Sequence, residues 1–287
     1  MKYAVIFYFS GTGNTEIVAN MIMKELYKHD YQTTLIRIED VLKEQLEINL
    51  DKYDLIGIGC QIIGFGTPSI VNKFVCMLPN VPDKKVFIFR TAGGVAPINY
   101  NASKPIIRKL ARKGFEVFYE RVFSISSNWV VKFDNAVIIK LFDATSKKVA
   151  IMSEELVNGK KRFLKTGSRL RILMEIAMPI FSKFFPLVGK DLIINETCSH
   201  CGLCIKNCPA NNIYNKKGKI KFRLSCNSCM RCVYLCPKSA IGFRFLTFFP
   251  IPGGYNIQKV LKEPFDSETA TGKIPPFFYD YIKDDAL

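Results

Sequence analysis

The first half of the chain alternates between two patterns of hydrophobic and polar residues. Short, nearly continuous apolar runs are typical of strands buried on both faces of a parallel sheet. They occupy residues 2–9, 33–38, 54–60, 85–91 and 115–123. Between them, apolar residues spaced three or four positions apart predict helices over 14–27, 69–77 and 103–113, and a longer helix that ends near Val157. The alternation predicts an α/β fold with a five-stranded doubly wound parallel sheet, covered by helices on both sides.

The pattern changes after residue 158. The following stretch is first basic and then apolar and aromatic, and Pro179 and Pro186 are expected to interrupt any long helix. Arg171, Glu175 and Lys183 argue against a membrane-spanning segment. We expect an amphipathic linker helix docked on one of the domains, with contact to a membrane surface as the alternative.

These changes in pattern divide the chain into four parts. The predicted sheet domain covers residues 1–158, and the basic and apolar linker covers 159–189. A small cysteine-rich α+β domain follows at 190–243. The tail 244–287, rich in Phe and Pro, is too short for a core of its own and is expected to pack on the domains.

Composition and charge narrow the choice of partners. With 48% hydrophobic and 23% charged residues the chain is of the globular type. Its formal net charge of +16 favours a solvated basic face or an acidic redox partner protein, since no zinc-finger, helix-turn-helix or RNA-binding motif points to nucleic acid. The first apolar run is too short for a membrane span and lacks the small-residue cleavage site of a signal peptide, so the cytoplasm is the expected location. In that reducing compartment, closely spaced cysteines favour metal or redox chemistry over disulfides.

Eight of the ten cysteines form two blocks with the same spacing. "CSHCGLCIKNCP" (198–209) and "CNSCMRCVYLCP" (226–237) both read C-x2-C-x2-C-x3-C-P. This spacing is that of the bacterial iron–sulfur run, in which the fourth cysteine of each block serves the other cluster. Two zinc sites are the alternative, but they would leave the third cysteine and the proline of each block unexplained. The predicted ligands of two 4Fe–4S clusters are Cys198, Cys201, Cys204 and Cys236 for the first, and Cys226, Cys229, Cys232 and Cys208 for the second.

A second motif lies between the first predicted strand and the first helix. In "FSGTGNT" (9–15) two glycines allow close backbone approach, three hydroxyls can donate hydrogen bonds, and the backbone amides lie at a helix N-terminus, which attracts anions. It is not a P-loop, because no Lys precedes the final Thr, and it lacks the third glycine of the dinucleotide fingerprint. The alternative is a capped helix start with no ligand.

Both motifs resemble those of known electron carriers. The loop resembles the flavin-phosphate loop of flavodoxins, and residues 190–243 resemble a bacterial two-cluster ferredoxin. Together, residues 2–243 are similar to the flavodoxin–ferredoxin fusion proteins of anaerobic bacteria. The resemblance implies that FMN binds at the carboxyl edge of the sheet. The implied contacts are Ser10, Gly11, Thr12, Gly13, Asn14 and Thr15 for the phosphate, and Gln61, Ile62, Gly64, Phe65, Gly66, Thr91, Ala92, Gly93, Gly94, Asn128 and Trp129 around the ring.

The pairing of carriers predicts the function. Iron–sulfur clusters pass one electron at a time, whereas FMN accepts one or two, so a chain that holds both is expected to relay single electrons between them. No residue near the expected ring site is an evident acid, base or nucleophile, which favours an electron carrier over a substrate-specific enzyme. Two alternatives remain open: a reductase of a quinone, nitro compound or free flavin at an open flavin face, and a redox sensor without flavin.

Overall fold

The computed structural model describes residues 1–262 and 274–283 of the chain. Its larger part is built on a five-stranded sheet in the order β2-β1-β3-β4-β5, and every neighbouring pair is parallel. This is the smaller doubly wound order, so the predicted fold class is confirmed. The strands are β1 (Lys2–Phe9), β2 (Tyr31–Arg37), β3 (Leu55–Gln61), β4 (Lys85–Thr91) and β5 (Glu116–Phe123).

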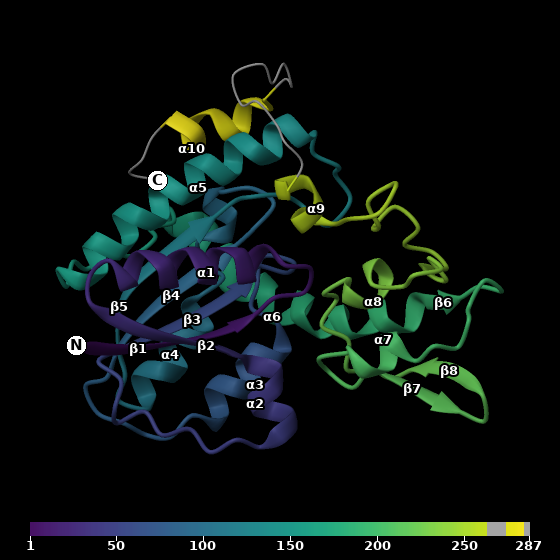
Figure 1. The fold of residues 1–287 in the computed structure, drawn as a ribbon, viewed down its shortest axis with the longest axis horizontal. Coiled ribbons are helices and arrows are strands. Elements are labelled where there is room, and N and C mark those ends of the chain that lie inside the picture. Colours follow the sequence, from purple (N-terminus) through teal and green to yellow (C-terminus); the bar gives the residue numbers. More distant parts are fainter. Residues whose placement is uncertain (263–273, 284–287) are drawn as a thin grey trace.

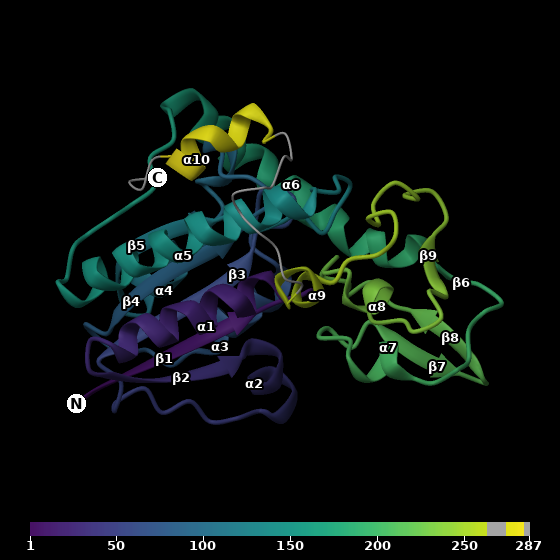
Figure 2. The ribbon, with the colours of Figure 1, turned by 45° about the horizontal axis from the view of Figure 1, so that its top comes forward.

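Helices cover both faces of this sheet (Figures 1 and 2). Because successive residues of a strand point to opposite faces, Ala4 and Ile6 of β1 face one apolar core, and Val5 and Phe7 face the other. The first core is closed by α1 (Asn14–Tyr27) and α5 (Asn135–Val157). The second is closed by α2 (Ile38–Glu44), α3 (Ser69–Met77) and α4 (Lys104–Arg112). The short helix η1 (Pro97–Asn99) precedes α4.

Helix α2 was not among the predicted elements. It has seven residues, of which Ile38 and Val41 are buried. Two apolar positions in two turns are too few for the helical period to stand out from the surrounding sequence. Its existence follows from packing against the sheet, not from a pattern that the sequence displays.

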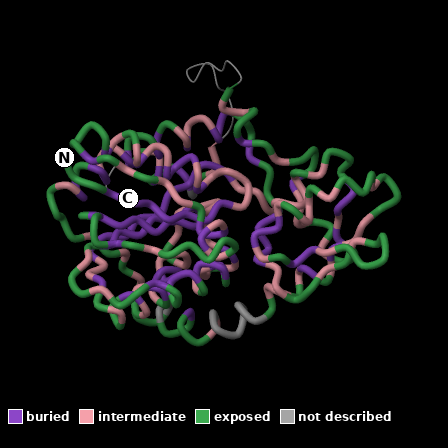
Figure 3. Tube along the Cα trace, turned by 60° about the horizontal axis from the view of Figure 1, so that its bottom comes forward, coloured by how far each residue is buried: buried purple, intermediate pink, exposed green. Residues whose placement is uncertain are grey.

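The smaller part of the chain holds both cysteine blocks. Two antiparallel pairs of strands form it, β6 (Leu192–Ile194) with β9 (Ile241–Phe243) and β7 (Ile213–Lys216) with β8 (Lys219–Phe222). Each block contains a one-turn helix, α7 (Leu203–Lys206) or α8 (Arg231–Tyr234). Figure 3 shows the buried positions of the described residues gathered inside the large domain, with a smaller group in the small domain.

One long helix, α6 (Ser168–Asp191), connects the two domains. The prediction that its prolines interrupt a long helix was wrong, since the helix continues through Pro179 and Pro186. An internal proline removes one backbone hydrogen bond and costs about 3 kcal/mol. Contacts of the helix with both domains favour this continuous form. Glu175 pairs with Arg108 of α4 at 2.7 Å, and the carbonyl oxygen of Phe185 accepts a hydrogen bond from Ser228 at 3.1 Å.

The tail packs back onto the large domain. Helix α9 (Ile257–Lys262) places Ile257 in the core beside α1 and α5, and η2 (Pro276–Phe278) and α10 (Tyr279–Lys283) lie along α5 (Figure 1). The hydroxyl of Tyr281 accepts a hydrogen bond from the backbone amide of Ser124 at 3.1 Å and lies 2.7 Å from the hydroxyl of Thr145. Residues 263–273 and 284–287 of the predicted tail lie outside the described residues. No helix in the described part of the chain is long and apolar enough to span a membrane.

Candidate functional site

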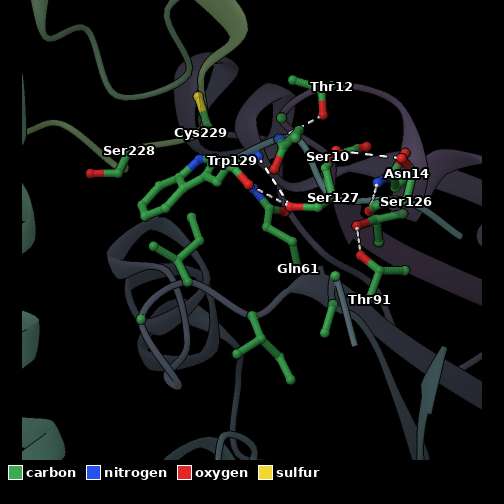
Figure 4. A pocket seen from close by; sticks show the side chains of 18 residues that line it. Ser10, Thr12, Asn14, Gln61, Thr91, Ser126, Ser127, Trp129, Ser228 and Cys229 are labelled. Atoms are coloured by element: carbon green, nitrogen blue, oxygen red, sulfur yellow. Dashed lines mark hydrogen bonds between the residues drawn. The ribbon is translucent and has the colours of Figure 1, made fainter. Parts of the chain in front are cut away.

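A pocket lies at the carboxyl edge of the sheet, where β1, β3, β4 and β5 end together (Figure 4). The sequence-predicted residues that line it are Ser10, Gly11, Thr12, Asn14, Thr15, Gln61, Ile62, Gly64, Thr91, Ala92, Gly93, Asn128 and Trp129. The four other predicted contacts, Gly13, Phe65, Gly66 and Gly94, do not line it. Sequence reasoning missed Ile63, Ser126, Ser127, Ser228 and Cys229, which complete its wall. The last two come from the second cysteine block.

The glycine loop between β1 and α1 is held by hydrogen bonds from several elements. The hydroxyl of Thr15 lies 2.7 Å from the hydroxyl of Thr91 at the end of β4. Asn128 donates to the hydroxyl of Thr12 at 2.8 Å, and Asn14 donates to the carbonyl oxygen of Ser126 at 2.9 Å. Because α1 begins at Asn14, its partial positive charge lies at this loop. A helix N-terminus beside a hydroxyl-rich loop is an arrangement that suits an anion such as a phosphate.

The wall opposite the loop contains an unpartnered amide. Both the nitrogen and the oxygen of the Gln61 side chain are buried and have no hydrogen-bond partner. A buried amide without a partner costs about 1–3 kcal/mol, so such groups are rare in folded proteins. Gln61 stands where β3 ends and lines the pocket. Its free donor and acceptor fit a planar ligand with polar edge atoms, such as the flavin ring.

Aromatic residues close the pocket on the side of the small domain. The Trp129 ring stacks on Phe249 of the tail, with ring centroids 4.9 Å apart, and tilts toward Phe185 of α6 at 6.3 Å. Gly64, at φ 50°, faces the same Phe185 ring, and a Cβ on it would lie 1.8 Å from the nearest ring carbon. A glycine at this position lets α6 approach the pocket. Trp129 thus supplies the bulky aromatic wall that the glycine-rich loops lack.

The eight block cysteines separate into two groups in the structure. Each group borders its own small, largely apolar pocket in the small domain. The first group is Cys198, Cys201, Cys204 and Cys236, and the second is Cys208, Cys226, Cys229 and Cys232. The fourth cysteine of each block therefore lies with the first three of the other block. In the described part of the chain no three Cys, His, Asp or Glu side chains meet around a single point suited to one metal ion.

The two groups differ in exposure. Cys201 of the first group is exposed, whereas Cys208 and Cys229 of the second are buried. Burial, together with repulsion from the nearby Cys229 and Cys208, raises the pKa of the Cys226 thiol to about 12. Burial likewise raises the pKa of Cys232. Thiolates in such a place need a cationic centre close by, and iron supplies this charge in an iron–sulfur cluster.

The pocket at the sheet edge and the second cysteine group share a wall. Ser228 and Cys229 line both pockets. The glycine loop packs directly against this wall. A Cβ on Gly11 would lie 2.4 Å from the carbonyl oxygen of Cys229. The sequence predicts that Gly11 allows close approach to the loop backbone, and in the structure the backbone of the second block makes such an approach while Gly11 also lines the pocket.

Comparisons with known proteins find a separate family match in each of the two domains. A family model described as a flavodoxin domain matches residues 5–113, and one described as a 4Fe-4S dicluster domain matches residues 197–241. Among solved structures, oxidised flavodoxin 2 from Bacillus cereus is 23% identical over 55% of this chain and 99% of that chain, with a TM-score of 0.41. Two-electron reduced Megasphaera elsdenii flavodoxin is 28% identical over 42% of this chain and 84% of that chain, with a TM-score of 0.34. Rubredoxin oxygen:oxidoreductase from the anaerobe Desulfovibrio gigas is 14% identical over 55% of this chain and 36% of that chain, with a TM-score of 0.42.

The two family matches define the class of this protein. The chain joins a flavodoxin domain to a 4Fe–4S dicluster domain, and the resemblance to flavodoxin–ferredoxin fusion proteins is confirmed. The flavodoxin domain implies FMN, and the dicluster domain implies iron–sulfur chemistry. It is an electron-transfer protein of the flavin and iron–sulfur type.

Proposed function

We propose that this chain relays single electrons between two 4Fe–4S clusters and an FMN held in the pocket at the sheet edge. The observation that carries the proposal is the wall shared by the flavin pocket and the second cysteine group, formed by Ser228 and Cys229. When bound, the clusters exchange one electron at a time and FMN one or two. The role of the protein is then to hold the three carriers side by side.

The exposure of the two cysteine groups supports an order in which electrons pass through the carriers. The first group, which contains the exposed Cys201, is the one that an external protein can approach. The second group faces the flavin pocket and is largely covered. Cys204 of the first group and Cys232 of the second pack against the same small core. We therefore infer an order of outer cluster, inner cluster and flavin.

The residues of the flavin pocket would bind and orient the cofactor. The amides and hydroxyls of residues 10–15 would hold the terminal phosphate at the N-terminus of α1. The Gln61 amide would take up hydrogen bonds with the ring edge, and Trp129 would cover the side that faces the small domain. Among the residues that line the pocket, Cys229 alone carries an ordinarily titratable side chain, and it belongs to the second cysteine group. The lining thus supports positioning of a cofactor more than acid–base catalysis on a substrate.

Charge supports an acidic external partner. Exposed Lys206 and Lys238 each lie two positions after a cysteine of the first group, Cys204 or Cys236. The hairpin of β7 and β8 adds the exposed Lys216, Lys217, Lys219 and Lys221. A basic surface around the outer cluster would steer an acidic redox protein toward it. Cysteines that serve as cluster ligands must stay reduced, and the cytoplasm is a reducing compartment. We therefore infer a cytoplasmic location.

The test is the kinetics of flavin reduction in the full chain. The protein is purified without oxygen, assayed for iron, acid-labile sulfide and flavin, and its clusters are reduced by a light pulse with a deazaflavin donor. We expect about eight irons per chain. The flavin band should then bleach in a first-order step whose rate does not depend on protein concentration. A rate that rises in proportion to concentration would contradict the internal relay, and absence of flavin would favour a sensor.

A further inference from the structure

Arg231 of the small domain reaches across the interface to the glycine loop. It lies between Cys229 and Cys232 of the second block. Its guanidinium donates to the carbonyl oxygen of Ser10 at 2.6 Å and to that of Gly11 at 3.3 Å. It also pairs with Glu39 of α2 at 2.5 Å, and both side chains are nearly buried, at 11% and 3% exposure. One buried cation thus binds two consecutive carbonyl groups of the loop.

These two bonds determine which way the loop amides point. In a planar trans peptide the C=O and N–H groups point in opposite directions. The carbonyl group of Ser10 shares a peptide with the amide of Gly11, and the carbonyl group of Gly11 shares one with the amide of Thr12. Because both carbonyl groups turn toward Arg231, the amides of Gly11 and Thr12 turn away from it.

The side of the loop away from Arg231 is the flavin pocket. Ser10, Gly11 and Thr12 line two cavities, the flavin pocket and a second cavity that also contains Arg231 and Tyr255. Arg231 lines only the second of these two cavities. The loop is therefore the partition between them, and amides that turn away from Arg231 face the flavin pocket.

We propose that Arg231 is a positioning residue for the flavin phosphate, supplied by the iron–sulfur domain to the flavodoxin domain. It orients the amides of Gly11 and Thr12 as hydrogen-bond donors toward the pocket. Because Arg231 is flanked by two predicted ligands of the inner cluster, assembly of that cluster also shapes the phosphate site. The inference rests on the proposed flavin site and adds a residue that the loop motif itself does not contain.

The experiment compares FMN with riboflavin, which lacks the phosphate. Dissociation constants of both flavins are measured by fluorescence quenching on full-length protein with its clusters present and its flavin removed. The test variant is Arg231→Met in a Glu39→Gln background, so that no unpaired carboxylate is buried when the cation is lost. We expect FMN affinity to fall at least tenfold, because two amide hydrogen bonds to a charged phosphate are lost or weakened. Riboflavin affinity should change less than twofold.

Two controls separate loop orientation from domain docking in general. Glu39→Gln alone keeps the bonds from Arg231 to the loop and should change the FMN-to-riboflavin ratio less than threefold. Asn227→Ala removes another interdomain contact of the same block, in which the Asn227 side-chain oxygen accepts hydrogen bonds from Ser69 and from the amide of Ile70 at 2.8 and 3.1 Å. It should weaken both flavins equally or not at all. Iron content, measured on each variant, confirms that the clusters remain.

The outcomes distinguish this inference from the proposed function. If the wild-type chain binds neither flavin, the proposed function fails before any variant is compared. If the wild type prefers FMN and the Arg231 variant keeps the same preference, the inference is overturned while the proposed function stands. An equal loss of both flavins in the variant also overturns it, because the arginine would then act on docking and not on the phosphate. Partial recovery of the preference in Arg231→Lys would support it, since a lysine keeps the charge but cannot bind both carbonyl groups as a planar fork.

Discussion

Gly11 and Cys229 meet across the interface between the two domains, and the contact leaves no room for a side chain on Gly11. A Cβ placed there would lie 2.4 Å from the Cys229 carbonyl oxygen and 3.0 Å from its Cβ. Both neighbours belong to the covalent frame of the second block, which cannot turn aside as a flexible side chain would. The glycine loop of the flavodoxin domain therefore packs directly against the backbone of the inner cysteine group.

The substitution Gly11→Ala tests this contact. We expect the domains to separate slightly, with a loss of about 1–3 kcal/mol of unfolding free energy from overpacking. Flavin reduction by the clusters should slow, while iron content stays constant because no cysteine is changed. Gly167→Ala is the matched control, since nothing lies within 4 Å of a Cβ there. Equal flavin reduction rates in the two variants would show that the contact does not govern the relay.

The grouping of the cysteines predicts which cluster each fourth cysteine serves. Cys208→Ala should damage the inner cluster, and Cys236→Ala should damage the outer one, although each residue lies in the sequence block of the other group. Electron paramagnetic resonance of the reduced protein, together with iron analysis, distinguishes the two losses. Cys76→Ala, at an exposed position outside both groups, is the control and should keep the full iron content. Stoichiometric zinc without labile sulfide in the wild type would contradict the assignment.

The unpartnered amide of Gln61 predicts opposite effects on stability and on binding. In flavin-free protein Gln61→Leu removes two buried polar atoms that lack partners, so unfolding free energy should rise by about 1–3 kcal/mol. FMN and riboflavin should both bind roughly tenfold more weakly, because the ring edge loses its partner. Thr33→Val removes another buried unpartnered oxygen, on β2 away from the pocket, and should stabilise without changing flavin affinity. Unchanged flavin binding in Gln61→Leu would place the ring elsewhere.

Glu155 predicts how stability depends on pH. Burial raises the pKa of its carboxyl group, but hydrogen bonds from Lys160, Tyr119 and Arg162 outweigh burial and lower the pKa to about 2 from an ordinary 4.5. A pKa lowered by folding stabilises the folded chain above pH 4.5, and this contribution is lost as the pH falls from 4.5 toward 2. Glu155→Gln should therefore lower the melting temperature at pH 7, and its difference from wild type should shrink below pH 4.5.

This pH dependence is measured by circular dichroism on the full chain at several pH values. Glu154→Gln, which changes the exposed neighbour on α5, should follow the wild-type curve throughout. A constant difference between wild type and Glu155→Gln from pH 7 to pH 3 would mean that the network of Glu155 does not contribute through its charge.

The sequence by itself determined the sheet, most of its helices and the nature of the two motifs. Buried parallel strands must be apolar on both faces, so the run of 85–91 predicted β4 with its bounds, and the loop 9–15 could be recognised because a strand, two glycines and a helix start lie within a few residues. The cysteine spacing is equally local, since thiols three residues apart can reach one centre whatever surrounds them. The interruption expected at Pro179 and Pro186 rested on a local penalty alone, whereas helix α6 also makes contacts with residues that are distant in sequence.

Only the tertiary structure decided how the glycine loop and the second cysteine block contact each other. Residues 228 and 229 form part of the flavin pocket, and Arg231 binds a loop that lies more than 200 positions earlier in the chain. The cysteine spacing of the second block identifies cluster ligands, but it does not indicate that residues of this block also contact the flavin domain. Likewise, Ser126 and Ser127 reach the pocket because β5 ends beside β4, and Phe65 and Gly94 do not reach it although their loops do. Hydrophobic period and motif spacing report on a residue's neighbours along the chain. The contacts that join an inner cluster to a flavin are made between surfaces that meet only after both domains have folded.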